Sequence, residues 1–110
     1  MKTAVIGSRG ITDVNLSEHL PEGTDEIVSG GAKGVDTIAR EYALANGIRL
    51  TEFLPDYARY KRGAPLKRNE QIIEYADVIL AFWDGQSKGT KFVIDKAEKL
   101  GKDVRVIVIE

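Results

Sequence analysis

The chain has 110 residues, of which 43% are apolar and 30% charged, and this composition excludes a disordered or membrane-embedded protein. Its 16 lysines and arginines against 17 aspartates and glutamates leave a net charge of -1, so total charge does not indicate a nucleic-acid or membrane partner. The absence of cysteine excludes a disulfide scaffold and a thiolate metal site, and the single histidine excludes a multi-histidine metal site.

Five short apolar segments predict β-strands. The segments 4–6, 26–29 and 77–83 are nearly continuous in apolar residues and are followed by glycine within two residues, which is typical of strands buried on both faces. The segments 48–54 and 104–109 contain interspersed polar residues, so we expect them nearer the edges of the sheet.

Between these segments, apolar residues recur at helical spacing. The spacing predicts helices over 35–46, 69–76 and 90–100, and Pro65 suits a position near the start of the second of these. A short helix is expected over 15–20.

The alternation of strands and helices predicts an α/β fold: a Rossmann-like three-layer domain with a parallel five-stranded sheet, order 3-2-1-4-5, and helices on both faces. We expect residues 1–110 to form a single domain. Such a sheet brings the loop after every strand to its carboxyl edge. A ligand crevice forms there, where the strand order reverses between the first and fourth strands.

Gly7, Ser8 and Arg9 follow the first strand. A glycine lets the backbone approach a ligand closely, the serine supplies a hydroxyl, and the arginine supplies a planar fork suited to phosphate or carboxylate. An ordinary turn with a solvated arginine explains the same residues equally well.

The loop after the second strand contains Gly30, Gly31, Lys33 and Gly34 and leads to Asp36. Free backbone N–H groups and the dipole of the following helix make such a loop a phosphate cradle. It is neither a Walker A loop nor a G-x-G-x-x-G fingerprint. A tight turn also explains the glycines, and Asp36 either supports the helix start or contacts a ligand hydroxyl.

Arg68 and Asn69 are expected to open the third helix and therefore to point toward the carboxyl edge. Asn69 is in phase with the apolar positions of that helix, so its amide faces inward and needs a backbone or ligand partner. Five cations fall between 59 and 68, and most of them are interpreted as a solvated face.

Asp84, Ser87, Gly89 and Thr90 lie between the fourth strand and the last helix. They form a second anion-friendly helix N-terminus, although Ser87 or Thr90 can equally cap that helix. Two helix N-termini facing one crevice from opposite sides suit a ligand that carries phosphates or a ribose.

Several aromatic residues allow more than one role. Phe82 is expected in the core and His19 at the surface, whereas Trp83 fits packing and base stacking equally. Tyr57 and Tyr60 anchor a loop or line the mouth of the pocket, and their mixture with cations is also found in surfaces that bind single-stranded nucleic acid.

In this order, the four segments resemble the SLOG superfamily of Rossmann-like nucleotide-binding domains, and in particular the small stand-alone YspA/YpsA-related SLOG proteins. The resemblance spans about positions 3 to 108. Each motif alone is weak, and the ordered set is specific. The matching residues are Gly7-Ser8-Arg9 with Thr12-Asp13, Gly30 to Asp36, Ala64-Pro65 with Arg68-Asn69, Ala76-Asp77, Phe82 to Asp84 and Ser87 to Thr90.

Two related families share parts of the pattern. The DNA-processing protein A domain, which binds single-stranded DNA and the recombinase, has similar Gly-Ser-Arg, Ser-Gly-x-Ala-x-Gly-x-Asp and Arg-Asn segments. The lonely-guy phosphoribohydrolases have Pro-Gly-Gly-x-Gly-Thr-x-x-Glu at the fourth loop, but Val93 stands here in place of the glutamate. Asn69 stands where the second residue of their Arg-Lys pair lies. The resemblance therefore implies their binding edge without their activity.

The resemblance implies binding, or sensing, of a nucleotide or nucleotide-derived ligand at the carboxyl edge. The alternatives are a nucleotide or nucleoside N-glycosidic hydrolase with Asp36 or Asp84 as base, and a single-stranded DNA-binding module using 59–68, against which the balanced charge argues. We expect no metal, cofactor or membrane contact, a cytoplasmic location and, by analogy with the dimeric relatives, a homodimer. The expected ligand-binding residues are Gly7, Ser8, Arg9, Gly30, Gly31, Lys33, Gly34, Asp36, Arg68, Asn69, Asp84, Ser87, Gly89 and Thr90.

Overall fold

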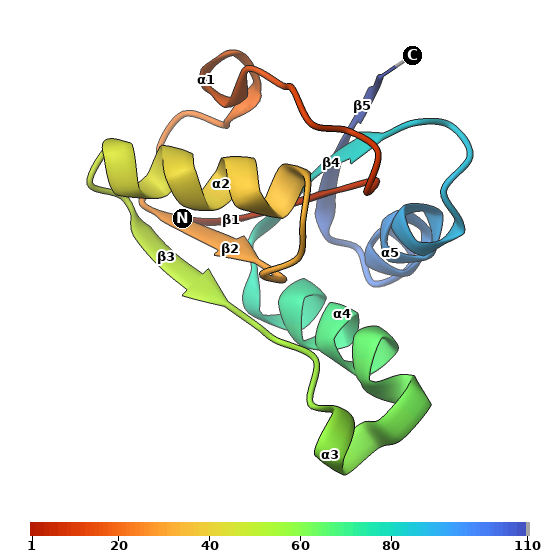
Figure 1. The fold of residues 1–110 in the computed structure, drawn as a ribbon. Helices are drawn as coiled ribbons and strands as arrows, with labels where there is room; N and C mark the ends of the chain where they lie inside the picture. Colours follow the sequence, from red (N-terminus) through yellow and green to blue (C-terminus); the bar gives the residue numbers. More distant parts are fainter. Residues whose placement is uncertain (110) are drawn as a thin grey trace.

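The computed structural model describes residues 1–109 and contains a five-stranded parallel sheet (Figure 1). The strand order is β3-β2-β1-β4-β5, which confirms the predicted α/β topology. Ala4 in the central strand pairs with Val28 on one side and Ile79 on the other. The strands are β1 (Lys2–Gly7), β2 (Glu26–Ser29), β3 (Arg49–Glu52), β4 (Val78–Trp83) and β5 (Asp103–Val108).

The helices cover both faces of the sheet, as predicted (Figure 1). They are α1 (Leu16–His19), α2 (Val35–Ala45), α3 (Tyr57–Tyr60), the 3-10 helix η1 (Lys61–Gly63), α4 (Ala64–Tyr75) and α5 (Lys88–Lys99). Alternate residues of β1 point to opposite faces: Ala4 and Ile6 pack with α4 and α5, whereas Val5 packs with α1 and α2. Each face of the sheet therefore has its own apolar cluster.

The helix predicted over 69–76 begins earlier, because α4 starts at Ala64. The predicted position of Pro65 near the helix start is confirmed: it lies in the first turn, where the missing proline N–H costs no hydrogen bond. The prediction began only where apolar periodicity becomes regular. The turns of α3 and η1 lack that periodicity and were not predicted; α3 is instead capped by Asp56, whose carboxylate accepts from the backbone N–H of Arg59 at 3.2 Å.

The expectation that His19 lies at the surface holds only in part. Its ring is half-buried and packs edge-on against Phe82, with 5.6 Å between the ring centroids. Phe82 itself is fully buried, as predicted. The short helix α1 therefore closes one apolar cluster by placing an aromatic ring over it.

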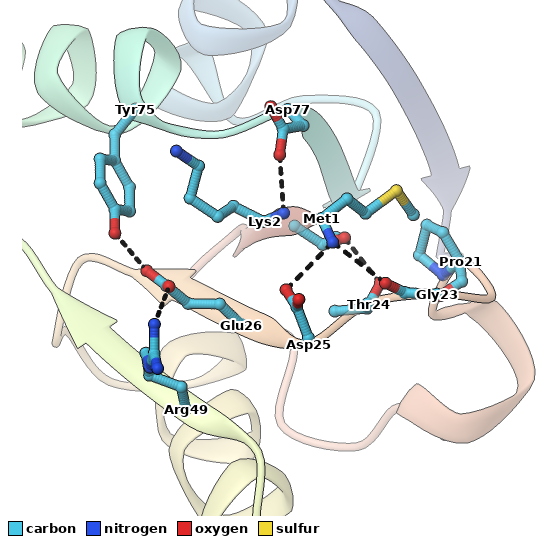
Figure 2. Close-up of polar contacts among 11 residues, drawn as sticks. Met1, Lys2, Pro21, Gly23, Thr24, Asp25, Glu26, Arg49, Tyr75 and Asp77 are labelled. Atoms are coloured by element: carbon cyan, nitrogen blue, oxygen red, sulfur yellow. Dashed lines mark hydrogen bonds and ion pairs between the residues drawn. The ribbon is translucent and has the colours of Figure 1, made fainter.

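The amino edge of the sheet carries a polar network, shown in Figure 2. The carboxylate of Glu26, a residue only 4% exposed at the start of β2, accepts hydrogen bonds from the hydroxyls of Tyr75 and Thr51 and faces Arg49 at 3.6 Å. These bonds keep the pKa of Glu26 below its ordinary value, chiefly through the Tyr75 hydroxyl, although burial opposes the shift. Glu26 thus joins β2, β3 and the end of α4.

The lowered pKa of Glu26 predicts an acid-sensitive contribution to folding. A carboxylate with a depressed pKa stabilises the fold above its unfolded-state pKa, and that stability is lost as pH falls through the folded-state pKa. We expect Glu26→Gln to lower the free energy of unfolding by about 1 kcal/mol at pH 7, since a neutral acceptor forms weaker hydrogen bonds. Urea unfolding between pH 7 and pH 3 should show the difference shrinking; a constant difference would contradict it.

Candidate functional site

A cleft of about 470 Å³ lies at the carboxyl edge of the sheet, where the loops after β1, β2 and β4 meet the N-terminal half of α4. This is the edge that the strand order predicts for a ligand site. Its lining residues are Ile6, Gly7, Arg9, Gly10, Gly30, Ala32, Lys33, Asp36, Pro65, Arg68, Asn69, Ile72, Asp84, Ser87, Gly89, Thr90 and Val93.

Gly7 allows the first turn of α2 to lie directly on the end of β1. A Cβ at this position would come within 2.8 Å of the Cβ of Val35 and 3.0 Å of the carbonyl oxygen of Phe82. Neither a core side chain nor a strand backbone can move aside cheaply. Gly7 is therefore required for packing, and this close contact places the start of α2 beside the cleft.

Ser8 lies beneath the cleft and does not line it. The residue is 1% exposed, and its hydroxyl accepts from the backbone N–H of Asp84 at 3.3 Å and contacts the Thr90 hydroxyl at 3.4 Å. The serine thus holds the loop after β1 against the loop after β4. The structure gives Ser8 these protein partners, while its predicted ligand contact stays untested.

Arg68 joins α4 to the end of β2. Its Nη1 donates to the carbonyl of Gly30 at 2.7 Å, and its Nε donates to the side-chain oxygen of Asn69 at 2.9 Å. A Cβ on Gly30 would lie 2.5 Å from Nη1, so glycine there leaves room for the guanidinium. The expectation that Arg68 and Asn69 open the helix is wrong, because they occupy its second turn, yet both side chains line the cleft.

Asp36 fixes the loop before α2 and also lines the cleft. Its Oδ2 accepts from the backbone N–H of Ala32 at 3.0 Å, upstream of the helix, whereas the N-cap position itself is Gly34. Burial raises the pKa of Asp36 above its ordinary value; the Ala32 hydrogen bond and the nearby Arg68 charge oppose that shift. The cleft therefore contains one carboxyl group that gives up its proton less readily than an exposed aspartate does.

Gly31 and Gly34 do not line the cleft, although the sequence analysis placed them at a phosphate. Both have positive φ angles, 69° and 80°, which glycine adopts without strain. A Cβ on Gly31 would collide with the Leu54 side chain, and one on Gly34 would lie 3.0 Å from the carbonyl oxygens of Arg9 and Ile11. In this structure the two glycines shape the loop beside the cleft.

Asp84 organises the loop after β4. Its carboxylate accepts from the backbone N–H groups of Ser87 at 2.7 Å and Gln86 at 2.9 Å, and these bonds lower its pKa. Ser87 is the N-cap of α5 and accepts from the N–H of Thr90, so the capping alternative for Ser87 is what the structure shows. The indole N–H of Trp83 donates to the Ser87 carbonyl at 3.0 Å, which ties this ring to the loop.

The remaining charges favour an anion at the cleft. Arg9 and Lys33 are exposed, and neither forms an ion pair with any residue from 1 to 109. The N-termini of α2 and α5 also flank the space, with Gly89 and Thr90 of α5 lining it. No group of three or more potential metal ligands exists within the described part of the chain.

The model of the YspA, cpYpsA-related SLOG family matches residues 1–60. The chain belongs to this family. Membership in the SLOG family indicates a nucleotide-related role in ligand binding or processing. The matched region covers β1 through α3 and thus the loops after β1 and β2, which form one side of the cleft.

The chain is also 36% identical over 81 residues to the Gene 61 protein of Mycobacterium phage D29. That match covers 68% of this chain and 65% of the phage protein, so the chain spans less than two thirds of its relative. No solved protein structure matches the chain. None of the helices within residues 1–109 is long and apolar enough to cross a membrane.

Sequence reasoning missed the apolar and small residues of the cleft. Ile6 and Ile72 were interpreted only as apolar positions of a strand and a helix, and Val93 only as the replacement of a glutamate, yet all three line the cleft. Val93 occupies the position of the lonely-guy glutamate, so an apolar wall replaces a carboxylate there. These positions could have been predicted from the sequence, because an apolar residue at the carboxyl end of a strand or at the start of a helix lies beside the carboxyl edge of the sheet.

The opposite pKa shifts of the two cleft carboxylates predict opposite effects of amide substitution. The raised pKa of Asp36 means that its negative charge destabilises the folded state. This destabilisation is absent below about pH 3.8, the ordinary pKa of the group, and develops as pH rises through the folded-state pKa. We expect Asp36→Asn to raise the melting temperature at pH 7 and to match the wild type near pH 3. Asp84→Asn should instead lower it at pH 7. Equal behaviour of the two variants in thermal melts would contradict this.

Gly89 offers a way to crowd the cleft without disturbing the fold. It lies in the first turn of α5, and a Cβ there meets no atom within 4 Å. Because alanine favours a helix over glycine, we expect Gly89→Ala to stabilise the protein by roughly 0.5–1 kcal/mol in urea unfolding. A loss of stability would show that position 89 is more constrained than its surroundings indicate.

Proposed function

We propose that the cleft binds a nucleotide or a nucleotide-derived small molecule, with its phosphate near the start of α5 and the cations Arg9, Lys33 and Arg68. The observation that carries the proposal is the position of the cleft: it lies at the switch point of a parallel sheet, between two helix N-termini. Family membership supports a nucleotide-related ligand. A volume of about 470 Å³ falls within the usual range for small-molecule sites.

The polar groups that remain free suit the other parts of such a ligand. The carboxylate of Asp36 accepts from the Ala32 N–H and has the Ser29 hydroxyl beside it, and its remaining acceptor capacity would serve ribose hydroxyls. The amide of Asn69 accepts from Arg68 through its oxygen, so its NH₂ group stays available to a base or phosphate. In this proposal Arg68 neutralises phosphate charge while it keeps its bond to the Gly30 carbonyl.

A direct test combines native mass spectrometry with calorimetric titration. Protein purified from its own host is examined for a retained nucleotide mass, and the apo protein is titrated with nucleoside mono-, di- and triphosphates and with inorganic phosphate. We expect Arg9→Ala/Lys33→Ala to weaken nucleotide binding at least fivefold without a change in melting temperature, since both side chains are exposed and form no ion pair within residues 1–109. Gly89→Ala should weaken it as well.

The matched control is Lys96→Ala/Lys99→Ala, which removes two cations from the far end of α5. This variant should bind nucleotide within twofold of the wild type. Failure of every nucleotide to bind, or equal losses in the two double variants, would contradict the proposal.

A second candidate is hydrolysis of an N-glycosidic bond, favoured by the two carboxylates, Asp36 and Asp84, that line the cleft. One of them would act as general base and take a proton from a water that attacks the anomeric carbon. The bond to the nucleobase then breaks, and the base leaves with a proton from solvent. Chromatography for free base after incubation with nucleoside monophosphates tests this, with Asp36→Asn and Asp84→Asn each compared with the wild type for base release and, by calorimetry, for binding. Loss of release beyond the loss of binding in either variant is the expected result, and no release of base by the wild type would contradict it.

A further inference from the structure

A second positively charged feature lies outside the cleft. We call the segment from Tyr57 to Lys67 the basic tip; it comprises α3, η1 and the first turn of α4. Figure 1 shows α3 and η1 at the far end of α4, projecting away from the sheet. None of the 17 aspartates and glutamates falls within the basic tip, whereas four of the 16 lysines and arginines do. The near-neutral total charge therefore conceals a local concentration of cations.

The cations of the basic tip are poorly neutralised. Arg59, Lys61 and Arg62 are exposed and form no ion pair within residues 1–109. Lys67 reaches a carboxylate only at 4.0 Å, that of Glu70. The nearest acid before the tip, Asp56, uses its carboxylate to accept from the backbone N–H of Arg59. Positive charge at the tip is thus available to an external polyanion.

Aromatic rings lie among these cations. Tyr57 is 59% exposed, and the Tyr60 ring has the Arg59 guanidinium at 5.4 Å and the Lys67 ammonium at 5.8 Å from its centroid. The two tyrosines are three residues apart in one helical turn, a spacing that places side chains on the same face. The half-buried Tyr60 thus holds two cations close to the exposed ring of Tyr57, one helical turn away. A free ring with cations near it is the arrangement that stacks a base while neighbouring phosphates are neutralised.

The backbone gives an independent reason to attribute a role to one of these cations. Lys61 has a φ of 54° and is the only non-glycine residue with a positive φ among residues 1–109. A glycine would adopt this conformation with less strain. Residues in such sparsely populated conformations cluster at functional sites, so Lys61 is a candidate for a role of its side chain.

We propose that the basic tip binds single-stranded nucleic acid, independently of the cleft. A single strand presents free base faces next to phosphates, and so matches rings and cations together. A paired duplex hides its base faces, and an acidic peptide offers charge with no flat apolar face for Tyr57. The small size of the surface fits a contact of a few nucleotides.

The test is fluorescence anisotropy of labelled fifteen-residue oligothymidine and oligouridine with the whole chain, from 50 to 300 mM NaCl. Each neutralised phosphate of a single strand contributes about 0.7 to the salt slope, so three or four cations predict a slope of about 2 to 3 for log Kd against log salt. Arg59→Ala/Arg62→Ala should weaken binding at least tenfold and roughly halve that slope. Lys61→Gly should weaken binding while raising the melting temperature.

Matched variants separate the basic tip from general charge and from the cleft. Lys96→Ala/Lys99→Ala removes the same charge elsewhere and should bind within twofold of the wild type. Tyr57→Ala should weaken binding at least fivefold, whereas Tyr57→Phe, which keeps the ring, should not. Arg9→Ala/Lys33→Ala should leave oligonucleotide binding unchanged even though it impairs nucleotide binding in the cleft.

Several results would overturn the proposal. One is the absence of oligonucleotide binding at 50 mM NaCl. Another is an equal loss of affinity in Arg59→Ala/Arg62→Ala and in Lys96→Ala/Lys99→Ala. Polyglutamate and anionic phosphatidylserine vesicles are added as competitors at the same total charge as unlabelled oligothymidine. If either displaces the labelled strand as strongly as oligothymidine does, the basic tip is assigned to an acidic protein or a membrane instead. Loss of oligonucleotide binding only in Arg9→Ala/Lys33→Ala would move the strand to the cleft and leave the cleft proposal intact.

Discussion

The first turn of α2 packs against the last residue of β1 at a separation that only glycine permits at position 7. A Cβ there would lie 2.8 Å from the Cβ of Val35 and 3.0 Å from a carbonyl oxygen of β4. This contact sets the height of the helix N-terminus above the sheet, and with it the distance between the loops after β1 and β2. The shape of the cleft therefore depends on a packing constraint beneath it.

Arg68 combines a structural and an electrostatic role. Its bonds to the Gly30 carbonyl and the Asn69 amide hold α4 against the end of β2, and its charge faces the cleft that holds Asp36. Such a guanidinium is preorganised, because its orientation is fixed before any ligand arrives. The same bonds mean that removing Arg68 alters the cleft wall as well as its charge, so Arg9 and Lys33 are cleaner probes of binding.

Periodicity and glycine placement predicted every strand, the sheet order and the edge of the cleft, because buried parallel strands and amphipathic helices leave strong repeating patterns. The exact start of α4 and the turn of α3 were not predicted, since Ala64 and Tyr57 stand outside any regular apolar repeat. The opposite pKa shifts of Asp36 and Asp84 were also not predicted from the sequence. Burial of one carboxylate and two backbone N–H bonds to the other are properties of tertiary structure that spacing does not record.

The two edges of the sheet are chemically distinct. At the amino edge, Glu26 contacts Tyr75 and Arg49 (Figure 2) and also accepts from the Thr51 hydroxyl, and this network ties three elements together. At the carboxyl edge, Arg9 and Lys33 have no ion-pair partner within residues 1–109. Substitution of Arg9 or Lys33 therefore removes no contact of the Glu26 network at the amino edge. In the proposed nucleotide-binding role, the charges that would select a ligand therefore lie outside the contacts that hold the amino edge of the sheet together.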